Sequence, residues 1–254
     1  MTREFAGLRA PAKLTWYLEV TGRRADGYHE LRSEMTTIDY CDVVVVEEGA
    51  DYLTVFNPLR TPVPIDDTNI VARALRLVGR RAGVTIDKSI PVGGGLGGGS
   101  ADAAAILRWA GGVEPERALT LGGDVPFCQL GGRALVEGVG ERLTELPFEE
   151  RWVTLIMPDF GVSTADCYRA YDQLRDGGWT PAGSNHLEEP AGVVESRLAT
   201  TLAWLRSEWG PDVALAGSGS TMFVEGRLDE DRGHWDMTGP EGPLQFVQTI
   251  TTPN

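Results

Sequence analysis

The sequence predicts an α+β fold, in which helices and strands are mixed without regular alternation. Two observations support this class. The first third is rich in the β-branched and aromatic residues that favour strands, and a later glycine-rich stretch leads directly into alanine and leucine, which favour a helix. A chain of 254 residues can form one large domain or two smaller ones. We predict two, residues 1–148 and 149–254, with the boundary in the loop LPFEER.

The first elements are expected to be strands at Lys13–Val20, Asp42–Glu48 and Tyr52–Phe56, the third after a Gly-Ala-Asp turn. A helix then begins with Thr68 as its N-cap, and its apolar residues recur on one face up to Gly83. A short strand, VTI, leads from this helix into the glycine-rich stretch.

The second half continues with a helix at Ser100–Ala110 and further helices near Ala165–Leu174 and from about Pro190 to Trp209. The acidic stretch EGRLDEDRGHWD is expected to be a solvated surface segment. The remaining strands are expected at Arg133–Gly138, Trp152–Pro158, Val213–Leu215, Met222–Val224 and Pro243–Ile250.

The glycine-rich stretch, PVGGGLGGGSADAAAIL, places six glycines within seven positions directly before a predicted helix. Glycine allows close backbone approach to a ligand, and a helix N-terminus offers unpaired N–H groups and partial positive charge. Together they favour a phosphate site over a hinge or a tight turn. The pattern G-x-G-x-x-G is present, but the acidic residues near the distance expected for a dinucleotide fold flank Pro115 in a loop, and no Walker-type G-K-[S/T] follows.

Composition limits the function classes. The net charge of −14 argues against a nucleic-acid or anionic-membrane surface, so local donors must hold any polyanionic substrate. Three cysteines lie far apart and suggest neither a disulfide framework nor a zinc site. The sequence shows neither a signal-peptide pattern nor an apolar run long enough to span a membrane, and we expect a soluble, cytoplasmic protein.

Three separated stretches resemble the kinase superfamily of galactokinase, homoserine kinase, mevalonate kinase and phosphomevalonate kinase: APAKLTWYLEVTGRRADGYHEL, IPVGGGLGGGSADAA and LAGSGSTMFVE. GRRADGYHEL and LGGDVPFCQLGGRALVEGVGE resemble, more specifically, the 4-diphosphocytidyl-2-C-methyl-D-erythritol kinase family. The resemblance implies a two-domain kinase fold with the active site in the cleft between domains. It also identifies an ATP phosphate loop, formed by Pro91, Val92, Gly93, Gly94, Gly95, Leu96, Gly97, Gly98, Gly99, Ser100 and Ala101.

The resemblance also assigns catalytic roles. Asp124 matches the aspartate that orients the substrate hydroxyl and accepts its proton, and Lys13 matches the lysine that pairs with it and stabilises transferring charge. Taken alone, Asp124 is better explained as a turn former before a proline, and Lys13 as a surface charge at a strand end; the motifs together reverse this. Thr15 stands where the family usually has asparagine beside the active site, so a substrate hydrogen bond is expected to differ.

The remaining site residues also come from the resemblance. Ser100 is an N-cap, a magnesium-side ligand or both. In GSGST, Gly217 and Ser218 match substrate-binding positions, and this motif is expected to fold over the phosphate loop. Residues matching the cytosine pocket are Tyr28 under the base, His29 at its edge, and Thr164 and Tyr168 nearby; Asn69 and Lys88 match the adenine side. The alternative for Tyr28 and His29 is a β-turn whose aromatic ring covers the core.

The predicted function is ATP- and Mg²⁺-dependent phosphorylation of the 2-hydroxyl of 4-diphosphocytidyl-2-C-methyl-D-erythritol, in the non-mevalonate pathway to isoprenoid precursors. The alternatives are a superfamily kinase acting on another small alcohol, a catalytically inactive nucleotide-binding relative and, more distantly, a dinucleotide oxidoreductase. We expect a monomer or weak homodimer with a small-molecule substrate and neither nucleic-acid nor membrane partners. Valine at Gly95 or Gly97 is expected to abolish ATP binding while leaving the fold intact, since the loop should lie at the surface of the core.

Overall fold

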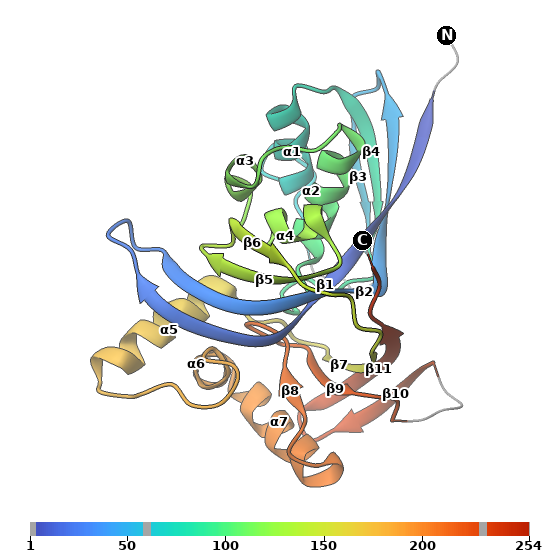
Figure 1. Cartoon of the computed structure of the whole chain (residues 1–254). Helices are drawn as coiled ribbons and strands as arrows, with labels where there is room; N and C mark the ends of the chain where they lie inside the picture. The colour runs from blue at the N-terminus through green and yellow to red at the C-terminus, as the bar shows by residue number, and fades with distance from the viewer. Residues whose placement is uncertain (1–3, 58–61, 229–232, 254) are drawn as a thin grey trace.

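The computed structural model describes residues 4–57, 62–228 and 233–253, and the strands in these ranges form two sheets. The first sheet is built around a long antiparallel hairpin of β1 (Phe5–Arg23) and β2 (His29–Glu48), drawn in blue in Figure 1. Both strands are longer than predicted from the sequence, because the pairing between them extends into the charged and glycine-containing stretches at their ends. The order β3-β4-β2-β5-β6 is completed by β3 (Leu53–Phe56), β4 (Ala82–Asp87), β5 (Arg133–Gly138) and β6 (Arg142–Glu145).

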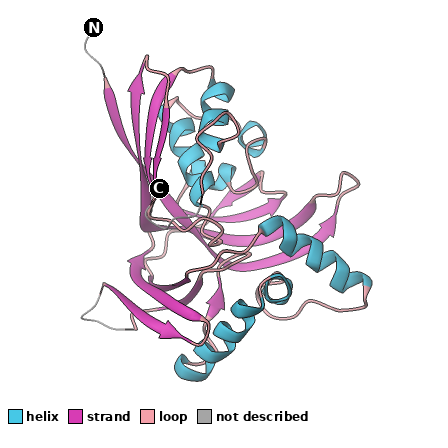
Figure 2. Cartoon of the chain, turned by 180° about the vertical axis from the view of Figure 1, so that it is seen from behind, coloured by secondary structure: helices cyan, strands magenta, loops and turns pink. Residues whose placement is uncertain are grey.

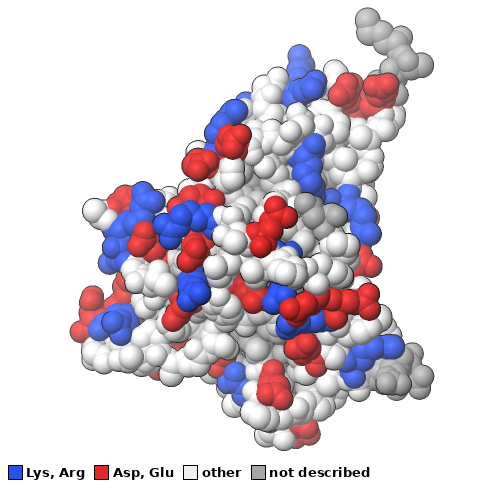
Figure 3. All heavy atoms as spheres, viewed as in Figure 1, with Lys and Arg blue, Asp and Glu red and all other residues white. Residues whose placement is uncertain are grey.

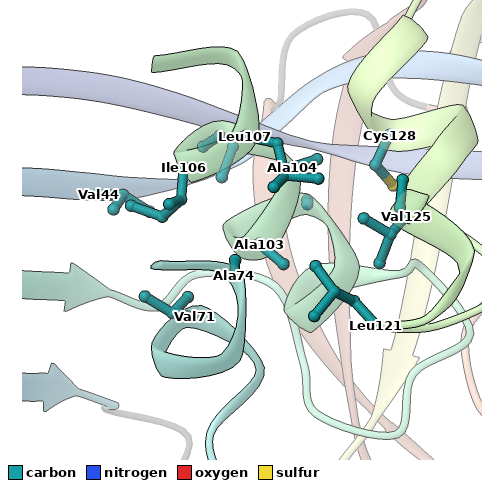
Figure 4. Packing of buried hydrophobic residues seen from close by; sticks show 14 of the residues in the cluster. Val44, Val71, Ala74, Ala103, Ala104, Ile106, Leu107, Leu121, Val125 and Cys128 are labelled. Carbon is teal, nitrogen blue, oxygen red and sulfur yellow. The ribbon is translucent and has the colours of Figure 1, made fainter. Parts of the chain in front are cut away.

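Four helices of the described ranges, α1 (Ile70–Val78), α2 (Gly98–Trp109), α3 (Pro115–Leu119) and α4 (Val125–Leu130), lie together beside the first sheet (Figure 1). Helix α2 is the central one. Its small residues Ala103 and Ala104 let neighbouring helices approach closely, and Ile106 fills the space toward β2 (Figure 4). The helix that follows the phosphate loop is therefore fixed by packing on several sides.

The second sheet has the order β10-β11-β7-β9-β8 and is antiparallel throughout. Helices α5 (Thr164–Asp176), α6 (Glu188–Val194) and α7 (Ser196–Trp209) lie in the lower part of the molecule with this sheet (Figures 1 and 2) and share its hydrophobic core. The strands are β7 (Trp152–Pro158), β8 (Ala214–Leu215), β9 (Met222–Glu225), β10 (His234–Gly239) and β11 (Gly242–Ile250). The predicted α+β class is confirmed.

Several predicted boundaries are wrong. Asn69, not Thr68, caps α1, because the Asn69 side chain accepts a hydrogen bond from the backbone N–H of Val71. The same helix ends at Val78, where Gly79 turns left-handed, rather than continuing to Gly83.

A later prediction is also corrected. The single helix expected from Pro190 to Trp209 is interrupted at Glu195, whose extended backbone ends α6 and whose side chain caps α7. The described residues of EGRLDEDRGHWD lie at the surface as predicted, and from His234 onward they form strand β10, paired with β11; residues 229–232 lie outside the described residues.

The halves of the chain share a hydrophobic core. Leu14 and Ile38 of the first sheet pack in one cluster with Leu155 of the second, and Ile38 forms an isolated bridge with Thr251. The predicted boundary at 148/149 falls between β6 and β7, and the division into two domains stays a prediction. Within the described residues, we find no helix with the length and apolar character needed to cross a membrane. Acidic and basic side chains are interspersed on the face seen in Figure 3.

Candidate active site

The part of the phosphate loop before α2, residues 91–97, lies in the connection from β4 to α2 and depends on glycine for its shape. Gly93, Gly95 and Gly97 adopt φ values of +73°, +74° and +69°, a region that other residues rarely occupy. The last of them is the N-cap position of α2, so Ser100 lies inside the first turn, and the prediction that it is an N-cap is wrong. Ser100 remains available as an oxygen donor in the site.

The GSGST motif lies against this loop, as predicted. The backbone N–H groups of Ser220 and Thr221 donate to the carbonyls of Gly93 and Gly94, at 3.1 Å each. A Cβ on Gly95 would lie 2.0 Å from the carbonyl oxygen of Ala216. The expectation that valine at Gly95 would leave the fold intact is therefore wrong, because the backbone of Ala216 and Gly219 closes off the space beside Gly95.

A cavity of about 380 Å³, here called the donor cavity, opens beside the phosphate loop. Its polar side chains include Lys13, Asn69, Lys88 and Asp102. The predicted loop residues that line it are Pro91, Val92, Gly93, Gly94, Gly95, Gly97, Gly98, Gly99 and Ser100, joined by Gly217 and Ser218. Leu96 and Ala101 are buried beneath the loop. The backbone donors of a helix N-terminus thus face a space with polar walls that include two lysines, which suits a polyphosphate.

A second cavity of about 590 Å³, the acceptor cavity, adjoins the first. It is lined by Tyr28 and His29 from the β1–β2 hairpin, and by Arg169 and Asp172 from α5. Asp124 lines both cavities, together with Leu31, Met35, Ser100, Thr164 and Tyr168. The carboxylate of Asp124 therefore stands where the contents of the two cavities meet.

Lys13 and Asp124 are brought together as predicted, with 3.7 Å between Nζ and Oδ2. The lysine is buried and its ammonium also donates to the Thr15 hydroxyl at 3.0 Å, whereas the Asp124 side chain is 34% exposed. Thr15 itself is buried, so in this chain it positions the lysine. The result is a cation held in place beside a carboxylate that is free to meet a ligand.

The predicted cytosine-side residues divide into an exposed and an enclosed group. Tyr28 is 61% exposed at the hairpin end, while Tyr168 is largely enclosed and burial raises the pKa of its hydroxyl. The ring of His29 stacks on Tyr168 with centroids 4.7 Å apart, and its Nε2 lies 2.8 Å from Oδ1 of Asp172. His29 therefore covers one face of Tyr168, and a base sandwiched by Tyr28 and Tyr168 stays a prediction.

Thr164 and Ser218 connect the α5 N-terminus to the GSGST motif. Their hydroxyl oxygens are 2.8 Å apart, and both side chains line the donor cavity. Helix α5 thus presents Thr164, Tyr168 and Asp172 along one face, at spacings of four residues. This spacing was the signal in the sequence that identifies Asp172, which the sequence analysis missed.

Lys88 lies under the phosphate loop between two carboxylates. Its Nζ donates to Asp102 at 2.7 Å and also to Asp42, and all three side chains are buried. Burial alone would lower the pKa of Lys88, but the charges of Asp102 and Asp42 outweigh it and hold that pKa above its usual value. The same burial raises the pKa of Asp102, with Lys88 opposing the rise. Neither aspartate was among the predicted site residues.

Comparison with known proteins gives a consistent result. A sequence profile described as "GHMP kinases N terminal domain" matches residues 69–132, which include the phosphate loop and Asp124. A 4-diphosphocytidyl-2-C-methyl-D-erythritol kinase of Paracoccus denitrificans is 39% identical over 231 residues, covering 84% of each chain. The chain belongs to the 4-diphosphocytidyl-2-C-methyl-D-erythritol kinase family. A Methylibium petroleiphilum kinase of the same name is 37% identical over 87% of this chain and 85% of its own.

Solved structures extend this family assignment to the fold. A crystal structure titled 4-(cytidine 5'-diphospho)-2C-methyl-D-erythritol kinase aligns with 97% of this chain and all of its own, with a TM-score of 0.70 and 29% identity. A homoserine kinase from Cytophaga hutchinsonii aligns over the whole chain and 96% of its own with a TM-score of 0.58, and at 14% identity it shows the fold alone. The predicted resemblance, fold and kinase class are confirmed.

Proposed function

We propose that the protein transfers the γ-phosphoryl group of ATP to the 2-hydroxyl of 4-diphosphocytidyl-2-C-methyl-D-erythritol, the substrate named for its relatives. The observation that carries this proposal is the place of Asp124. Its carboxylate lines both cavities and lies 3.7 Å from the Lys13 ammonium. A phosphoryl donor in one cavity and an alcohol in the other would meet at this pair.

Phosphoryl transfer at Lys13 and Asp124 depends on positioning and charge neutralisation more than on covalent catalysis by the protein. The Asp124 carboxylate accepts the hydrogen bond of the substrate hydroxyl and takes its proton as the new O–P bond forms and the bond to ADP breaks. Lys13, held by Thr15, offsets the negative charge on the transferring group. The phosphate loop, with the α2 N-terminus behind it, holds the remaining phosphates through backbone N–H groups.

Mg²⁺ fits the site as a metal carried mainly by the nucleotide. Within the described residues, no group of three or more His, Cys, Asp or Glu side chains is placed to hold a metal ion. Magnesium commonly keeps waters and phosphate oxygens and takes only one or two protein ligands, one of which the Ser100 hydroxyl would supply. When bound, it would neutralise phosphate charge.

For the acceptor, Tyr28, His29 and Tyr168 form the aromatic wall proposed to hold cytosine. Asn69 lines the donor cavity, where adenine is proposed to bind. We also propose a cytoplasmic monomer or weak homodimer, acting on a small molecule without nucleic-acid or membrane partners. Because the chain as a whole is negatively charged, local donors rather than the overall field must hold the anionic ligands.

The test is a coupled assay of ADP release with 4-diphosphocytidyl-2-C-methyl-D-erythritol, mevalonate, homoserine and galactose as separate acceptors. We expect turnover with the cytidine compound and a kcat/KM at least about a hundredfold higher than with the others, because the alternatives leave the aromatic wall empty. Turnover of another alcohol with none of the cytidine compound would overturn the proposal.

A further inference from the structure

The cluster of Lys88, Asp42 and Asp102 connects the two sides of the phosphate loop. On the entry side, Oδ1 of Asp42 accepts hydrogen bonds from the backbone N–H groups of Ser89 (2.6 Å) and Ile90 (2.8 Å). On the exit side, Asp102 lies in α2, four residues after its first residue. Lys88 bridges the two carboxylates, so the strand entering the loop and the helix leaving it are both fixed to β2.

The cluster lies at the wall of the donor cavity. Lys88 and Asp102 both line that cavity, although they are 3% exposed. A Cβ on Gly98 would lie 3.2 Å from the Lys88 ammonium, so the first turn of α2 rests directly on it. Any change in the position of Lys88 would therefore be transmitted to the backbone that begins the helix.

Its chemistry argues against a role in packing alone. Burying a cation between two carboxylates removes all three charges from water, which is strongly unfavourable. Apolar side chains of similar volume often stabilise a core at least as well. Oδ1 of Asp102 is buried and finds no hydrogen-bond partner among the described residues. The Lys88 ammonium already donates to both aspartates, which leaves little of it for a direct contact with adenine.

We propose that Asp42, Lys88 and Asp102 are positioning residues, which set the distance between the two sides of the phosphate loop and thereby aim its backbone donors at a bound nucleotide. They act through the loop and not through contact with the transferring group. This inference rests on the proposed function only in taking a nucleotide as the ligand of the donor cavity.

The test measures nucleotide binding without turnover, by calorimetry with ADP and Mg²⁺, together with thermal melting. Asp102→Ala should weaken ADP at least about tenfold, whereas Asp102→Asn, which can still accept from Lys88, should weaken it less. In the coupled assay, KM for ATP should rise in Asp102→Ala while KM for the alcohol stays within about twofold.

The matched control is a second cation between two carboxylates: Arg133, which binds Glu34 at 2.8 Å and also contacts Glu149. These residues line neither cavity. Glu34→Ala should lower the melting temperature and leave the ADP affinity unchanged. If Asp102→Ala does not fold, the uncharged triple variant Asp42→Asn, Lys88→Met, Asp102→Asn replaces it, since it leaves no unpaired buried charge.

The outcomes separate the two proposals. Wild-type protein that binds no ADP contradicts the proposed function. Wild-type protein that binds ADP while the cluster variant binds it equally well contradicts the positioning role. A cluster variant that loses ADP affinity only in proportion to Glu34→Ala, with the same loss of melting temperature, also contradicts it.

Discussion

The chain twice places a lysine against acidic side chains, in opposite surroundings. Lys13 faces Asp124 at 3.7 Å across a site where the carboxylate is 34% exposed. Lys88 is bonded to two fully enclosed aspartates beneath the same loop. The Lys13–Asp124 pair is loose and open. This suits a pair that must contact a ligand and whose charge distribution changes during the reaction. The second is almost wholly buried, and only Lys88 and Asp102 reach the wall of the donor cavity, which suits a part that must keep its geometry.

Asp124→Asn, in the open pair of Lys13 and Asp124, should produce the largest effect, a loss of kcat. Without the carboxylate, kcat should fall about 10²–10⁴-fold, the range for loss of a positioned base. The melting temperature and ADP affinity should change little, because the side chain is partly exposed and its pairing with Lys13 is long. Steady-state kinetics with calorimetry check this. A kcat within tenfold of wild type would remove Asp124 from the mechanism.

Lys88→Met should show the reverse pattern. It leaves Asp42 and Asp102 as buried carboxylates without their cation, which costs about 3–5 kcal/mol of unfolding free energy. Urea denaturation measures this loss, and the matched Lys13→Met variant should lose far less stability. Equal losses in the two variants would erase the distinction between the open pair and the closed cluster.

Gly95→Ala tests whether the phosphate loop is as rigid as the closed cluster of Lys88, Asp42 and Asp102. The new Cβ would meet the Ala216 carbonyl, and the positive φ adds its own penalty. Gly79→Ala is the control, since Gly79 has φ +66° but open space around it, and should cost only about 1–2 kcal/mol. Gly95→Ala should cost clearly more by denaturation. An equal cost would show that the loop can move away from Ala216.

Tyr28→Ala extends the comparison to the aromatic side chains. Because this ring is mostly exposed, its loss should leave the melting temperature unchanged, yet weaken the cytidine substrate about tenfold or more if the ring stacks on cytosine. The enclosed Tyr168→Ala should weaken the same substrate and also lower the melting temperature. Titration with each ligand checks both variants, and an equal effect of Tyr28→Ala on ATP would contradict the cytosine assignment.

A further expected effect is a pH dependence of stability from Asp102. Burial raises the pKa of this carboxyl from 3.8 to about 7 in the folded chain, against the opposing charge of Lys88 and with the help of Asp42. The folded state therefore holds a proton that the unfolded state has lost, so stability falls as pH rises from about 4 to 7. Asp102→Asn should flatten this part of the curve in urea titrations, and an unchanged slope would contradict the assignment.

The sequence predicted the elements whose signal is local. Strands β5 and β7 have the predicted bounds, because each is a short apolar or alternating run between turns. The break between α6 and α7 was missed, since it depends on an extended backbone at Glu195 that helix propensity does not reveal. The hairpin strands were underestimated because cross-strand pairing, not composition, determines their ends.

The site residues divide in the same way, into those with a local sequence signal and those that only the fold brings together. The phosphate loop, Lys13 and Asp124 were predicted because they occur in motifs with a recognisable pattern. Asp42 was not, because it reads as the polar start of a strand, and only the fold brings it next to Lys88, 46 residues away. That Gly95 is enclosed by Ala216 also depends on contacts across 121 residues (216 − 95), which no local pattern encodes.

The wall shared by the donor and acceptor cavities has a consequence for kinetics and inhibitor design. Asp124, Ser100, Thr164 and Tyr168 belong to both cavities, so ligands in the two cavities would lie next to each other. If the phosphoryl group passes directly between them, as proposed, both substrates must be bound before reaction. Initial-rate plots should intersect rather than run parallel. One molecule that joins an adenosine polyphosphate to the alcohol would fill both cavities at once and bind more tightly than either half, because it pays the entropy of association once.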